Sequence, residues 1–295
     1  MLVGAYDAAN LGLGGWTLSP HHVFEPEQGD VYQGDGTTLR IDNTPHMEWI
    51  GGDPNLPETD GVPITQTSLG TGPNGLTAIA ADPDGSVWMA QGGYNTQPSD
   101  YASIRRMRPD GIVERATGNA PQADATDGGL AANARLYGAF VRVGPDGDLY
   151  VVDFHANRVW RVTNESPRRT RLFAGNGTTC TGNGCGDGSL AKTSPVNAPL
   201  GIAFDSAGNA YIAEYGPQGR IRKVDPKGKI STVIDTSTPA MVEVDGNGSL
   251  YFQASQGALY KLALSATAGT TPTTVASNPF QDVCSGPELF LDSSK

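Results

Sequence analysis

The chain lacks the features that mark several large classes of protein. Basic residues are scarce: 20 Lys and Arg stand against 31 Asp and Glu, which gives a net charge of −11 with His neutral. With no basic patch to offset this balance, nucleic acid is not an expected partner. No run of 18 apolar residues occurs, which excludes a transmembrane helix. The segment Met1–Asp7 has neither a positive nor an apolar region, so any export signal is expected outside this chain.

Glycine and proline, by contrast, are abundant, with 39 and 21 residues spread along the chain. Their distribution predicts many turns rather than one disordered tract. One order of segments recurs along the chain. It consists of an apolar strand, a turn of the D-x-x-G type, an aromatic-rich strand, a basic alternating strand and a short last strand. The clearest copy covers 200–234. Five copies align on turn glycines at positions 29, 85, 147, 208 and 248.

Four short strands in a unit of about 40 residues are typical of a β-propeller blade. The second strands, such as Tyr150–Val152, are continuous apolar runs, as expected for sheets buried on both faces. The third strands, such as Arg220–Val224, alternate in period two, so we expect one wetter face whose charges protect exposed edges. The predicted fold class is therefore all-β, a β-propeller with four-stranded blades, six-bladed with an incomplete last blade.

The repeat also predicts where the propeller lies in the chain. We expect it to occupy 21–295, with blades at about 21–52, 75–118, 138–175, 199–235, 239–277 and a partial one at 280–295. The last copy lacks its third and fourth strands, and an open ring leaves exposed edges. Either the N-terminal residues complete this blade or the chain is a fragment of a longer protein.

Residues that could carry chemistry are few. Gly-x-Ser-x-Gly is absent, so no serine nucleophile is expected. His21 and His22 are adjacent, so on a strand they point to opposite faces and are poorly placed to share a metal ion. The acidic turns, such as Asp82–Gly85, lack the ligand spacing of a calcium loop, and their Asp residues are expected to close β-turns. We predict no catalytic residue, no metal and no cofactor.

The three cysteines are Cys180, Cys185 and Cys284. Cys180 and Cys185 flank a glycine-rich segment, and a loop of this size can be closed by a disulfide. A zinc knuckle is the alternative, but the C-x₂-C spacing and further ligands are missing. We predict a Cys180–Cys185 disulfide with Cys284 free, which favours an oxidising compartment.

The central copies resemble NHL repeats, with Asn157–Val159 and Arg220–Pro226 as the most diagnostic residues. Three segments that precede blades look like the D-G-x-x-A inter-blade loop of secreted bacterial NHL proteins. They begin at Asp60, Asp127 and Asp187. We expect these three aspartates to brace their loops rather than to bind an ion. NHL-type lyases place a histidine near His155, which we therefore keep as a residue of the propeller rim.

A second resemblance is carried by Leu11–Leu18, by His21 and His22, and by Val31–Gly36. These residues look like the segment that leads into the propeller of bacterial YD-repeat proteins of the Rhs and teneurin-like family. The resemblance implies that 1–20 is a lead-in from a missing upstream domain. It also implies a YD-repeat shell after the propeller, of which this chain contains nothing.

These observations predict a non-catalytic propeller scaffold and protein-interaction module of a secreted or surface bacterial YD-repeat protein. Its partner would be another protein or the rest of its own larger chain, bound through the insertion loops 52–74, 119–135 and 175–198. The alternative is a metal-dependent lyase or lactonase acting in the central channel. That activity needs several His, Glu, Asp or Asn side chains on the axis, whereas inner strands such as Ala78–Ala80 supply none.

Overall fold

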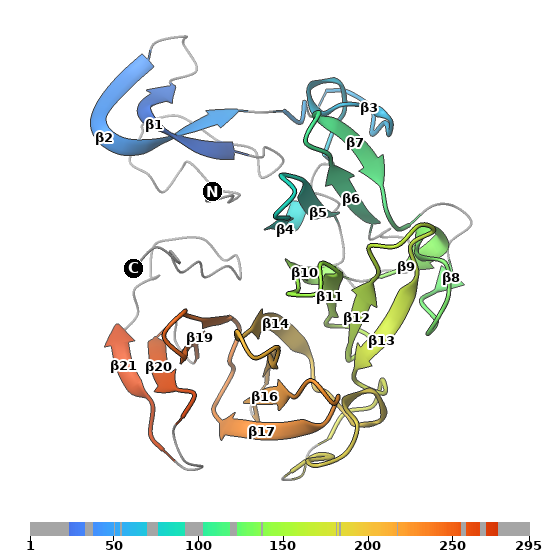
Figure 1. Ribbon diagram of the computed structural model, residues 1–295, viewed down its shortest axis with the longest axis vertical. Helices are drawn as coiled ribbons and strands as arrows, with labels where there is room; N and C mark the ends of the chain where they lie inside the picture. The colour runs from blue at the N-terminus through green and yellow to red at the C-terminus, as the bar shows by residue number, and fades with distance from the viewer. Residues whose placement is uncertain are drawn as a thin grey trace.

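The computed structural model describes residues 24–32, 38–49, 51–53, 55–69, 76–91, 103–118, 123–136, 138–180, 182, 184–216, 218–254, 258–265 and 270–276. Its main elements are four antiparallel sheets arranged around a common centre (Figure 1). The fold-class prediction of an all-β propeller with four-stranded blades is confirmed. The number of six blades stays a prediction, because 1–23 and 277–295 lie outside the described residues.

Each blade is a meander in which consecutive strands are neighbours. Blade 1 carries one additional strand at its outer edge, β3 (Val62–Pro63), which pairs with β7. The strands of blade 1 are β4 (Leu76–Ala81), β5 (Val87–Gln91), β6 (Ser103–Met107) and β7 (Ile112–Arg115). Those of blade 2 are β10 (Gly138–Val143), β11 (Leu149–Asp153), β12 (Arg158–Val162) and β13 (Thr170–Ala174). Those of blade 3 are β14 (Pro199–Phe204), β15 (Ala210–Glu214), β16 (Arg220–Val224) and β17 (Ile230–Asp235). Those of blade 4 are β18 (Val242–Val244), β19 (Ser249–Gln253), β20 (Leu259–Ala263) and β21 (Thr273–Ala276).

The blades are held together by apolar clusters that lie between neighbours. One cluster joins Trp88 of blade 1 to Val151 and Trp160 of blade 2. Two more join blade 2 to blade 3 and blade 3 to blade 4. This arrangement explains why the second strands are apolar on both faces: all five residues of β5, β11 and β15 are buried.

The tight turns between first and second strands follow the pattern expected from the sequence. Asp205 accepts backbone hydrogen bonds from Ala207 (3.0 Å) and Asn209 (2.8 Å), and Gly208 has a φ of +78°. The carboxylate therefore satisfies donors of the turn, while glycine supplies the left-handed backbone.

The segment predicted as the first blade, 21–52, has a different structure. It contains a two-stranded hairpin of β1 (Phe24–Tyr32) and β2 (Thr38–Trp49) instead of four short strands. A four-stranded blade needs further turns within this segment, but β2 continues without a break from Thr38 to Trp49. A tight turn with positive φ favours glycine, and the sequence contains none between 38 and 50.

The third strands also differ from expectation. We expected their charges to face water, but Arg105 of β6 and Arg222 of β16 are completely buried. Only one residue of each strand, Arg106 in β6 and Lys223 in β16, is more exposed than its neighbours, so burial does not alternate along these strands. Arg105 and Arg222 are buried because the inter-blade loop that precedes each blade covers them and supplies hydrogen-bond acceptors.

Three 3-10 helices and one short pair of strands complete the connections between blades. They are the 3-10 helices η2 (Ile64–Gln66), η4 (Ala131–Asn133) and η5 (Ala191–Thr193), and the short parallel pair β8 (Ala123–Asp124) and β9 (Ala134–Arg135). In the part of the chain that the structure describes, no helix has the length and apolar character needed to cross a bilayer.

Candidate functional site

The three inter-blade loops adopt one shared conformation. The glycine after each aspartate donates its backbone N–H to the outer strand of the following blade, as in Gly61 to Val113 (2.7 Å), Gly128 to Thr170 (2.8 Å) and Gly188 to Ile230 (2.8 Å). Three residues later each loop enters a 3-10 helix. The first residue of that helix is buried in every case: Ile64, Ala131 or Ala191. Each loop therefore covers the outer edge of the blade that follows it, which protects the edge strand.

In blade 1 the loop is fixed to a buried arginine. Asp60 accepts hydrogen bonds from Nε of Arg105 (2.9 Å) and Nε of Arg115 (2.9 Å). Arg105 also donates to the carbonyl oxygens of Ser68 (2.7 Å) and Thr59 (2.6 Å). Burial lowers the pKa of Arg105, and Asp60 opposes this by favouring its charged form. The guanidinium thus ties both ends of the loop to strand β6.

In blade 3 the equivalent residues are Asp187 and Arg222. Asp187 accepts from Nη2 of Arg222 (2.8 Å) and from the backbone N–H of Thr232 (3.0 Å). Arg222 also donates to Oε1 of Glu214 (3.0 Å) and to the carbonyl oxygen of Cys185 (3.1 Å). Burial raises the pKa of Glu214, against the opposing effect of the two nearby arginines. Arg222 therefore links the second strand, the inter-blade loop and the cysteine loop.

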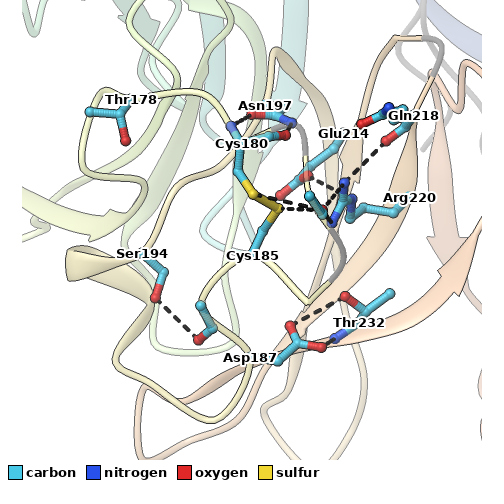
Figure 2. The surroundings of a disulfide bond; sticks show 12 residues. Thr178, Cys180, Cys185, Asp187, Ser194, Asn197, Glu214, Gln218, Arg220 and Thr232 are labelled. Carbon is cyan, nitrogen blue, oxygen red and sulfur yellow. Dashed lines mark hydrogen bonds and ion pairs between the residues drawn. A yellow bond between two sulfur atoms is a disulfide. The ribbon is translucent and has the colours of Figure 1, made fainter.

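The cysteine loop lies directly over this cluster. Cys180 and Cys185 are joined by a disulfide, and Figure 2 shows it beside Glu214 and Arg220. Arg220 lies 3.5 Å from the Glu214 carboxylate, and both side chains are almost completely buried. The backbone N–H of Cys180 donates to Oδ1 of Asn197 (2.7 Å). The glycine-rich loop is thus held at Cys180 by Asn197, just before blade 3, and at Cys185 by Arg222 of blade 3.

In blade 2 the loop has a weaker attachment. Asp127 accepts a hydrogen bond from the backbone N–H of Leu172 (3.2 Å). At the position of Arg105 and Arg222, strand β12 has Trp160, which is buried and offers no cation to this carboxylate. The three aspartates thus occupy equivalent positions with unequal partners.

A further charged pair lies where the inner strands converge. Arg142 of β10 and Glu243 of β18 form a bidentate ion pair, with Nη1 of Arg142 2.7 Å from Oε1 of Glu243. The two residues are opposite Tyr150 and Tyr251 in their sheets, and Ala203 is opposite Tyr211 in the blade between them. The pair therefore passes over β14 at a position that a small side chain leaves free. Burial raises the pKa of Glu243, and Arg142 opposes this shift.

Sequence analysis did not identify Arg142, Glu243, Arg105 or Arg222 as important residues. The sequence analysis considered apolar inner strands such as Ala78–Ala80 of β4, whereas β10 and β18 each carry one charged residue, Arg142 and Glu243. A signal did exist, because Arg142 and Glu243 occupy the same position relative to their turn glycines and carry opposite charges.

The remaining candidate residues are not brought together. His155 is exposed in the turn after β11 and makes an edge-to-face contact with Phe154, with 5.1 Å between ring centroids. His21, His22 and Cys284 lie outside the described residues. Among the residues that are described, no group of three His, Cys, Asp or Glu side chains could hold a metal ion.

The blades and their shared loops define the chain as an NHL-type β-propeller. A family model described as the teneurin NHL domain matches residues 71–245, and the chain belongs to that family. It is similar to teneurin-1 of Gallus gallus, with 27% identity over an alignment of 258 residues that covers 78% of this chain and 8% of that protein. Teneurin-m of Drosophila melanogaster is 29% identical over an alignment of 247 residues that covers 79% of this chain and 8% of that protein. The chain thus spans about 8% of the length of these relatives.

A solved structure supports the fold alone. A gluconolactonase from Xanthomonas campestris superposes with a TM-score of 0.51 at 10% sequence identity, covering 89% of this chain and 76% of that one. At this identity the likeness concerns the propeller architecture.

Proposed function

We propose that the chain is the non-catalytic propeller of a longer, secreted or cell-surface teneurin-like protein, and that it acts as a rigid protein-interaction module. Its partner is another protein or a further part of its own chain. The observation that carries this proposal is the attachment of the insertion loops: buried Arg105 and Arg222 fix loops that the fold itself does not require. Rigid loops on a propeller present a binding surface at low entropic cost.

The loops concerned leave the blades at one end. In an antiparallel meander the connections from outer to inner strands share an end with the hairpins between second and third strands. The insertions 52–74, 119–135 and 175–198 each lead into an inner strand, and they therefore reach the blades at the same end as the His155 turn and the exposed Tyr215. We place the interaction surface on this end, with the 175–198 loop as its most rigid part.

The geometry at the centre favours a scaffold over a channel enzyme. A catalytic metal requires several convergent ligands with an open coordination position. The inner strands offer Ala80, Arg142, Ala203 and Glu243 at equivalent positions. The one carboxylate is held by the guanidinium. A cation would have to displace Arg142 in order to bind Glu243.

Site-specific crosslinking in the longer protein tests the proposal. A photoreactive residue at Thr179, which is exposed in the cysteine loop, is expected to give crosslinks to a region outside the propeller or to a partner. The matched control is Asn247, exposed in a turn at the opposite end of blade 4. Equal crosslinking at both positions, or none at either, would contradict the assignment. So would turnover of a lactone that EDTA abolishes and calcium restores.

A further inference from the structure

A hollow of about 540 Å³ lies between the outer strand of blade 2 and the inter-blade loop of blade 3. It is lined by Asp127, Arg161, Arg171, Leu172, Phe173, Leu190, Lys192, Lys227 and Gly228. We name it the β13 groove. It arises because the 187–191 loop covers the edge of β17 and thereby stands beside β13.

The β13 groove is positively charged in a chain with a net charge of −11. Arg161 is already paired with Asp146 (3.1 Å) and Asp148 (2.9 Å). Arg171, Lys192 and Lys227 are exposed, and none of the three has an ion-pair partner among the described residues. The carboxylate of Asp127 is hydrogen-bonded to the Leu172 backbone. Three cations are thus free to meet an anionic ligand.

The blade architecture does not require these cations. The backbone pairing of the loops gives the equivalent residues one blade earlier: Glu114 in place of Arg171, Ala132 in place of Lys192 and Pro167 in place of Lys227. The loop conformation is the same in both places, whereas the charges are not. The preceding blade has cations at other positions, with Arg115 in place of Leu172 and Arg168 in place of Gly228, so the β13 groove differs from it in where its cations lie.

The floor of the β13 groove is apolar. Leu190 is 46% exposed, and Leu172 and Phe173 are partly exposed beside it. A sulfated glycan consists mainly of sulfate and hydroxyl groups, so it gains less from contact with an exposed leucine than an apolar side chain does. A peptide with acidic residues flanking an apolar residue would satisfy both the cations and the floor.

We propose that the β13 groove binds an acidic peptide segment whose carboxylates contact Arg171, Lys192 and Lys227 while an apolar side chain packs on Leu190. This inference deepens the proposed function, because it names a second surface of the interaction module and the chemistry of its ligand. The groove lies on the outer edge of the propeller, and it uses Leu190 and Lys192 of the 175–198 insertion rather than the part around Thr179 that crosslinking tests.

Fluorescence anisotropy with a labelled peptide Gly-Glu-Glu-Leu-Phe-Glu-Glu-Gly tests the proposal. Binding is expected to be saturable, to weaken as salt screens the charges, and to be lost for a peptide with Gln in place of Glu. The charge reversal K192E/K227E should weaken it about tenfold or more, with an unchanged thermal unfolding midpoint. The substitution Leu190→Ser should weaken peptide binding several-fold, because it removes an apolar contact from the floor of the groove.

The matched control is K223E/K261E, which changes the net charge equally on lysines outside the groove. Equal weakening by this control would overturn the proposal, because binding would then report net charge. If a heparin oligosaccharide bound more tightly than the peptide, and Leu190→Ser did not change its affinity, the proposal would be overturned. The ligand of the groove would then be a glycan and not a peptide. Absence of any peptide binding would also overturn it, while leaving the crosslinking result at Thr179 to decide the proposed function separately.

Discussion

Arg142 and Glu243 form a bidentate ion pair between the inner strands of blades 2 and 4, although 101 residues separate them in the chain. Blade 3 lies between these blades, so the pair fixes the distance between two sheets that are not neighbours. Both side chains are largely withdrawn from water, with 23% and 11% of their surfaces exposed. Such a pair stabilises the ring only while both partners are present.

Arg142→Ala should therefore lower the free energy of unfolding by about 2 kcal/mol, since it leaves a buried carboxylate without its partner. The double variant R142M/E243L should lie much closer to the wild type, because apolar side chains replace both charges. Urea denaturation of R142M, E243L and R142M/E243L measures the coupling energy. Additive effects of the single substitutions would show that the pair contributes nothing to stability.

The same pair predicts a pH dependence. Burial raises the pKa of Glu243 above its usual value, and Arg142 opposes this shift without cancelling it. Above the pKa of the unfolded chain, about 4.3, the folded protein then holds the proton more tightly than the unfolded one. The contribution of Glu243 to the free energy of unfolding must fall as the pH rises through this window.

Urea denaturation of the wild type and of E243Q between pH 4 and 7 tests this sign. The wild type's stability relative to E243Q should decrease as pH increases. E165Q, at an exposed glutamate, provides the baseline. A stability advantage of the wild type that grows with pH would mean that Arg142 dominates and that the pKa of Glu243 is lowered.

The inter-blade aspartates give a matched comparison. Asp187→Ala removes the carboxylate that meets the fully buried Arg222, which should cost about 3 kcal/mol in unfolding free energy. Asp127→Ala removes one hydrogen bond to a backbone N–H and should cost about 1 kcal/mol. Chemical denaturation of both variants checks the order. Equal losses would mean that the loops are held by their backbone hydrogen bonds and not by the arginines.

How far the sequence predicts these features depends on whether they repeat. The strands and their turns recur at fixed positions around glycines such as Gly147 and Gly208, so their periodicity identifies the blades. The aspartates of the inter-blade loops recur as well. Their partners do not, because Arg105 and Arg222 are replaced by Trp160 in blade 2. A long-range pair such as Arg142–Glu243 depends on which blades face each other, and local patterns do not contain that information.

The Cys180–Cys185 disulfide provides the last prediction. It closes a short loop, so its loss should lower the free energy of unfolding by about 2 kcal/mol through the entropy of the unfolded chain. The folded state should respond locally, since the backbone N–H of Cys180 is held by Asn197 and the Cys185 carbonyl by Arg222. We expect C180S/C185S to lower the thermal unfolding midpoint and to increase hydrogen exchange at the Cys180 position, leaving blade 1 unchanged.

The comparison is best made in a C284S background, so that no third thiol can exchange with the pair. Reducing agent should then lower the midpoint of the parent protein to that of C180S/C185S and leave the double variant itself unaffected. If the reduced parent and the double variant both kept the midpoint of the oxidised protein, the cluster around Glu214, Arg220 and Arg222 would hold the loop without the disulfide. In that case the covalent bond would have no part in presenting this loop to a partner.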